Sequence, residues 1–71
     1  MIKLNEIGEN AGRVWRTLES MGEVPVHVLF EQMEMTHEDL LMAIGWLARE
    51  DKVEITEVNG IEVIRLPKFY M

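Results

Sequence analysis

Hydrophobic positions recur with a helical period over residues 36–51 and predict the central helix of the fold. Thr36 can serve as its N-cap, and Asp39 three residues later completes a capping box. Apolar residues at three- and four-residue spacing give this helix one broad face for the core, which comprises Leu40, Leu41, Ile44, Leu47 and Ala48. The opposite face comprises Glu38, Met42, Gly45, Trp46 and Arg49. What that outer face contacts is the functional question.

A first helix is expected over residues 5–21. Asn5 is a good N-cap for it. Its apolar stripe consists of Ile7, Ala11, Val14, Leu18 and Met21. Gly8 and Gly12 lie one helical turn apart and indicate a groove where another backbone comes close.

A short helix over residues 26–34 is expected between these two. Gly22 suits a left-handed cap at the end of the first helix. Pro25 then favours an extended segment or a one-bridge strand over residues 24–26. Together with residues 36–51, the short helix forms a helix-turn-helix arrangement.

The period changes to two after the central helix and predicts a β-hairpin of residues 52–58 and 61–66. Asn59-Gly60 between them is a strong signal for a type I′ turn, which fixes the register. One hairpin face, which suits the core, carries Val53, Ile55, Ile64 and Leu66. The other face carries Val58, Ile61 and Val63. A hairpin apolar on both faces, followed by an apolar tail over residues 67–71, indicates a covering partner.

This order of elements is that of a winged helix-turn-helix domain. The segments IGENAGRVWRTLESMGEV and LLMAIGWLAREDKVEI resemble a family of small prokaryotic winged-helix domains without an established function. The resemblance covers residues 7–66 and is most specific at AIGWLARED, with Lys52-Val53 opening the wing. It implies an α+β fold of three helices and a C-terminal two-stranded wing, in a single domain over residues 1–71, and a compact dimer.

The length and composition of the chain exclude several sources of stability. A domain of 71 residues buries only about 60% of the surface of its unfolded chain. The chain has no cysteine, and its two histidines, His27 and His37, lack the spacing of a zinc site. We therefore expect no metal and no cofactor, and a partner subunit as the remaining source of stability. Ser20 has no histidine near it in sequence, and 71 residues leave little room for a catalytic pocket, so no enzymatic activity is expected.

Charge and hydropathy narrow the choice of partner. Seven basic and thirteen acidic residues give a net charge of −6, which disfavours binding to nucleic acid. The longest uncharged apolar run covers residues 40–48 and is too short to cross a bilayer. With no stretch of signal-peptide type at the start, we expect a cytoplasmic protein without membrane contact.

Two functions remain. The first is a module that acts through protein contacts, by forming a homodimer, with a second protein as a further candidate partner. Its expected interface residues are Met42, Trp46, Val58, Ile61, Val63, Phe69 and Tyr70. Trp46 has a second interpretation, in which it packs beneath the wing.

The alternative is a small DNA-binding transcriptional regulator. In such proteins the outer face of the third helix enters the major groove, where only Arg49 of this chain could read a base. The candidate basic residues are Arg13, Arg16, Arg49, Lys52, Arg65 and Lys68.

Overall fold

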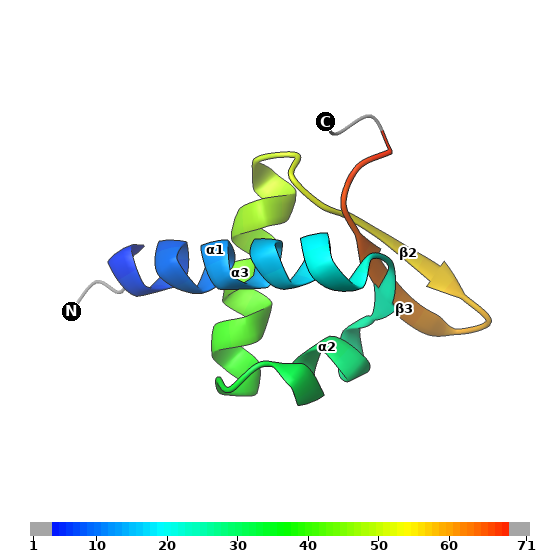
Figure 1. The fold of residues 1–71 in the computed structure, drawn as a ribbon, viewed down its shortest axis with the longest axis horizontal. Coiled ribbons are helices and arrows are strands. Elements are labelled where there is room, and N and C mark those ends of the chain that lie inside the picture. Colours follow the sequence, from blue (N-terminus) through cyan, green and yellow to red (C-terminus); the bar gives the residue numbers. More distant parts are fainter. Residues whose placement is uncertain (1–3, 69–71) are drawn as a thin grey trace.

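Three helices pack beside a three-stranded antiparallel sheet in the computed structural model, which describes residues 4–68 (Figure 1). The elements in chain order are α1 (Leu4–Met21), β1 (Val24–Pro25), α2 (Val26–Gln32), α3 (His37–Arg49), β2 (Glu54–Val58) and β3 (Ile61–Arg65). This is the α+β winged helix-turn-helix fold that the sequence predicts, with the β2–β3 hairpin as the wing.

The core lies where α1 crosses α3 (Figure 1). From α1 it takes Ala11, Val14 and Leu18, and from α3 it takes Leu40, Ala43, Ile44 and Leu47. Leu41 and Ala48 were expected in the core and are exposed, Leu41 by 51%. The expectation is wrong because α1 covers only part of the apolar face that the helical period predicts for α3. Both residues lie at the uncovered edge of that face.

Both ends of α3 are capped by hydrogen bonds, by a side chain at the start and by the backbone at the end. The hydroxyl oxygen of Thr36 accepts a hydrogen bond from the Asp39 backbone N–H at 3.1 Å, as the sequence predicts. At the other end, Asp51 adopts a φ of 59°. Its N–H donates to the Ala48 carbonyl at 3.1 Å, and the Lys52 N–H donates to the Leu47 carbonyl at 2.9 Å. This pair of bonds is the Schellman motif, with aspartate where glycine is usual.

The boundaries of α1 and α2 agree with the predicted ones to within two residues. Gly22 closes α1 with a φ of 76°, and its N–H donates to the Leu18 carbonyl at 2.8 Å. This confirms the predicted left-handed cap. The second helix ends at Gln32 rather than at residue 34.

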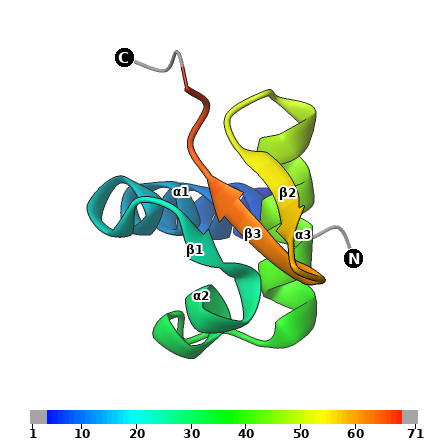
Figure 2. The same cartoon turned by 90° about the vertical axis from the view of Figure 1, so that its right-hand side faces the viewer.

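The hairpin has the predicted register, with Val58 opposite Ile61 and Ile55 opposite Ile64. Asn59 and Gly60 both have positive φ, 53° and 79°, as a type I′ turn requires. The short β1 strand pairs with the far side of β3, so that the sheet order is β1-β3-β2 (Figure 2). Consequently β3 is the central strand and β2 is an edge strand.

The burial of two hairpin residues differs from the sequence-based expectation. Val63, expected on the open face, is only 7% exposed. It lies on the central strand β3, which has a paired strand along each edge, and its partner on β1 is Pro25. Ile55, expected in the core, is 47% exposed. It lies on β2, the edge strand, which has a neighbouring strand on one side only.

Candidate interaction surface

The start of α3 and the tip of the wing border a shallow hollow of about 560 Å³. We call it the α3–wing groove, and its lining includes Val26, His27, His37, Leu41, Glu57, Ile61 and Glu62. Leu41 on α3 and Ile61 on β3 are 51% and 46% exposed. These are unusually large exposures for apolar side chains that share one concave surface.

The wing side of the α3–wing groove is acidic. Glu57 and Glu62 stand directly opposite each other on β2 and β3, and both are exposed. Like charges in directly opposed positions destabilise a sheet. Neither carboxylate forms an ion pair with any residue between 4 and 68. Glu38, exposed in the first turn of α3, follows His37 in the sequence but does not line the groove.

The two histidines at the groove do not form a metal site. The His37 ring meets the Phe30 ring edge-on, with the centroids 4.7 Å apart, and so links α2 to α3. Over the described part of the chain, no group of three or more histidine or acidic residues could hold a metal ion. Nor does any helix within residues 4–68 have the length and hydrophobicity needed to span a membrane.

The expected interface residues occupy several environments. Met42, Val58 and Ile61 are exposed, by 38%, 47% and 46%. Val63 is buried, as described above, and Phe69 and Tyr70 lie outside the described residues. Leu41 and Ile55 join the exposed apolar set although the sequence pattern assigned both to the core. The exposure of Ile55 follows from its place on β2, because an edge strand has a neighbouring strand on one side only.

Trp46 packs against α1 rather than beneath the wing, and it is half-buried. A Cβ atom at Gly8 would lie 3.9 Å from Cζ2 of Trp46, and one at Gly12 would lie 3.5 Å from an Arg16 guanidinium nitrogen. The two glycines therefore face side chains. The expected close approach of another backbone is wrong.

Trp15 and Trp46 both line a cleft of about 500 Å³ between α1 and α3, which we call the α1–α3 cleft. Arg16 and Lys52 also line it, together with Glu19 and Glu50. Lys52 and Glu50 form an ion pair at 3.6 Å. The positive charges in this cleft are thus matched by carboxylates.

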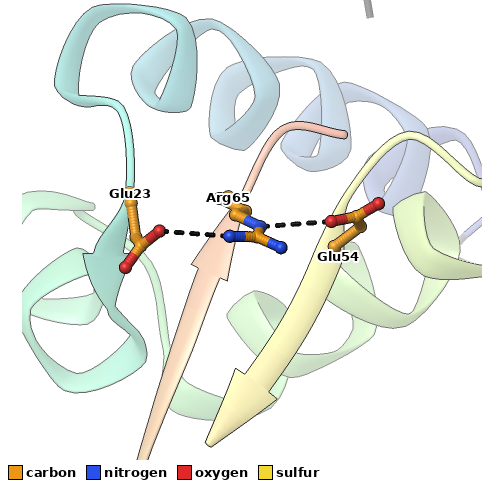
Figure 3. Close-up of polar contacts among 3 residues, drawn as sticks. All are labelled: Glu23, Glu54 and Arg65. Carbon is orange, nitrogen blue, oxygen red and sulfur yellow. Dashed lines mark hydrogen bonds and ion pairs between the residues drawn. The ribbon is translucent and has the colours of Figure 1, made fainter. Parts of the chain in front are cut away.

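Arg65 holds two acidic side chains across the sheet (Figure 3). Its Nε lies 3.1 Å from Glu54 of β2, and its Nη1 lies 3.5 Å from Glu23, next to β1. All three side chains are more than a third exposed, so each pair contributes only about 0.2–1 kcal/mol. The guanidinium is nevertheless occupied by carboxylates and is poorly placed to bind a phosphate.

The six candidate basic residues are spread over several parts of the fold, and only Arg49 of them belongs to α3. Arg13 and Arg16 line a hollow between α1 and the end of α2 that also contains Glu34. Arg49 is in the last turn of α3, and Lys68 is exposed beyond β3. None of the six candidates lines the α3–wing groove.

Comparison with known proteins identifies the same fold. The model of a winged helix-turn-helix domain family, DUF2582, matches residues 1–66. The chain is 36% identical over 64 residues to the uncharacterized protein MJ1608 of Methanocaldococcus jannaschii, over 86% of this chain and 90% of that protein. It is also similar to the solution NMR structure of protein BT2368 from Bacteroides thetaiotaomicron, with a TM-score of 0.82 and 34% identity. That match covers 92% of this chain and 79% of the other.

Proposed function

The chain belongs to the DUF2582 family of winged helix-turn-helix domains, a fold that does not by itself define an activity, and from its exposed surface we propose that it acts through protein contacts. In this proposal the domain is a non-enzymatic module that first binds a second copy of itself. The supporting observation is a set of large apolar side chains exposed on α3 and the wing: Leu41, Met42, Ile55, Val58 and Ile61.

The free edge of β2 is the surface best suited to a second copy. All five residues of β2 are exposed, and the strand carries two glutamates but neither lysine nor proline, the residues that most often protect an edge. Antiparallel pairing of two such edges places the same residues in contact on both copies, as a two-fold dimer requires. It would join the two sheets into one.

The charges of β2 are compatible with this pairing. Arg65 already neutralises Glu54. If two β2 strands pair about Thr56, Glu57 of one copy stands opposite Ile55 of the other, so that the two Glu57 carboxylates are not directly opposed. Each fully buried apolar side chain contributes about 1.5–3 kcal/mol. A few of these contacts are comparable with the stability of a small domain.

Sedimentation velocity at micromolar concentration tests this proposal. We expect a dimer for the parent chain and a monomer for Ile55→Lys, because a lysine on an edge strand opposes strand pairing. Leu4→Lys is the matched control, since Leu4 is also apolar and 55% exposed but lies on α1. A parent chain that remains monomeric would contradict the dimer.

The alternative, a small DNA-binding regulator, is favoured only by the fold and by Arg49 in the last turn of α3. Titration of the chain into mixed-sequence duplex DNA at low salt separates the two functions. We expect no binding. Binding that weakens steeply with salt and is lost in Arg49→Glu would favour the regulator.

A further inference from the structure

We propose that the α3–wing groove docks a basic, amphipathic segment of another protein. An apolar side chain of the segment would lie between Leu41 and Ile61, and its lysine or arginine side chains would contact Glu57 and Glu62. The inference rests on the proposed function only in treating the domain as a protein-contact module. It concerns the groove between α3 and the wing tip, which shares Glu57 with the edge strand β2.

The apolar part of the groove provides the anchor site. Leu41 and Ile61 come from different elements and are each about half exposed, while Val26 at the start of α2 is partly buried against the core. The hollow of about 560 Å³ that they line can accept side chains of a docked segment. An amphipathic helix placed in an apolar groove is a common mode of peptide recognition.

The acidic part of the groove selects the charge of the segment. Glu57 and Glu62 repel each other across the β2–β3 pair, and no ion pair within residues 4–68 offsets this repulsion. A lysine or arginine of the partner placed between them would remove the repulsion and form charge-assisted hydrogen bonds. The electropositive start of α3 does not reverse this preference, because its first turn carries Glu38 and Asp39.

The same charges disfavour a nucleic acid or a second copy of the chain as the occupant of the groove. A nucleic acid would bring phosphates next to Glu57 and Glu62, and no lysine or arginine lines the groove to compensate. A second copy of the chain, with a net charge of −6, would also bring predominantly negative charge. Charge complementarity therefore assigns the groove to a basic segment.

Isothermal titration calorimetry and NMR chemical-shift mapping on the full chain test the inference. The probe is a short amphipathic peptide of leucine and lysine, and its matched comparison replaces each lysine with glutamate. We expect the basic peptide to bind, to weaken as salt is raised, and to shift the amide signals of Leu41, Glu57, Ile61 and Glu62. We expect no binding of the acidic peptide.

Charge reversal in the groove gives the matched variants. The double variant Glu57→Lys, Glu62→Lys keeps a like-charged pair at this position of the sheet, so its folding should be little changed. It and its control are made in the Ile55→Lys chain, because a lysine at position 57 of β2 would itself oppose strand pairing. We expect the Glu57→Lys, Glu62→Lys variant to bind the basic peptide at least about tenfold more weakly. The control Glu9→Lys, Glu19→Lys makes the same change of net charge at exposed positions of α1 and should bind as the Ile55→Lys chain does.

Several results would overturn the inference: no binding of the basic peptide, equal binding of the acidic one, or equal losses in the two double variants. Binding of duplex DNA that shifts the groove signals would also overturn it. So would a dimer that Leu41→Glu dissociates, because that result gives the groove to a second copy. Peptide binding by a monomeric chain would instead contradict the dimer alone and support the groove.

Discussion

Asp51 occupies a backbone conformation that glycine adopts more easily. Its φ of 59° places it in the left-handed region, at the Schellman position that closes α3. This conformation strains residues that carry a Cβ atom. A single residue thus ends the central helix at some cost in stability.

We predict that Asp51→Gly raises the free energy of unfolding. The expected gain is up to about 1 kcal/mol, since relief of the strain is partly offset by the greater freedom of glycine in the unfolded chain. Urea denaturation monitored by circular dichroism measures it. Asp51→Ala, which retains a Cβ atom, is the control and should give no gain. A lower midpoint for Asp51→Gly would contradict the interpretation.

Thr36 provides the cap at the opposite end of the same helix. Thr36→Ala removes the acceptor of the Asp39 N–H bond, so we predict a loss of about 1 kcal/mol in unfolding free energy. Thr36→Ser keeps a hydroxyl and should retain most of the stability. Guanidinium denaturation compares the variants, and equal midpoints for alanine and serine would rule out the cap.

At the scale of elements, the position of a strand in the sheet determines how far its apolar side chains are buried. Ile64 and Ile55 are paired partners of the same residue type, yet Ile64 is fully buried on the central strand and Ile55 is 47% exposed on the edge. Alternation along a strand does not distinguish these cases. Burial depends on the neighbours in space.

The pair gives a direct prediction. Ile64→Ala should lower the free energy of unfolding by about 2–5 kcal/mol, because it removes buried methyl groups and leaves a cavity. In the monomeric chain, Ile55→Ala should change it by less than about 1 kcal/mol. Urea denaturation of both variants at concentrations too low for dimer formation provides the measurement. Similar losses at the two positions under these conditions would mean that Ile55 is covered within a single copy.

Much of the fold could be predicted from local patterns. Asn59-Gly60 fixes the hairpin pairing because a two-residue loop permits one register. The burial of Val63 could not be predicted, because it depends on the two-residue strand β1 pairing with β3. For Leu41, helical periodicity gave an apolar face but not how much of it α1 covers. The candidate site was therefore predicted only in part.

For the remaining site residues too, local sequence patterns predicted exposure better than they predicted how the elements come together. Met42, Val58 and Ile61 are exposed as expected, although their role in binding stays a prediction. The α3–wing groove was not predicted, because it requires the wing tip and α3 to come together in three dimensions. The opposition of Glu57 and Glu62 was implicit in the register, yet its significance depends on the absence of a lysine or arginine from the groove lining.

For the whole molecule, dimer formation should be coupled to folding. If a second copy binds only the folded chain, the thermal unfolding midpoint rises with protein concentration. We predict this rise for the parent chain and its absence for Ile55→Lys. Differential scanning calorimetry over a wide concentration range measures it. A midpoint independent of concentration in the parent would contradict a dimer coupled to folding.

The positions of Trp15 and Trp46 determine which optical signals will be informative. They are the two tryptophans of the chain, and both line the α1–α3 cleft, whereas neither lines the α3–wing groove. Intrinsic fluorescence should therefore follow separation of the two long helices during denaturation and respond weakly to ligand docking at the wing. Because the chain has no cysteine, one introduced at Met42, which is exposed on α3 and follows the groove residue Leu41, would be a unique attachment point for a dye near the docking site.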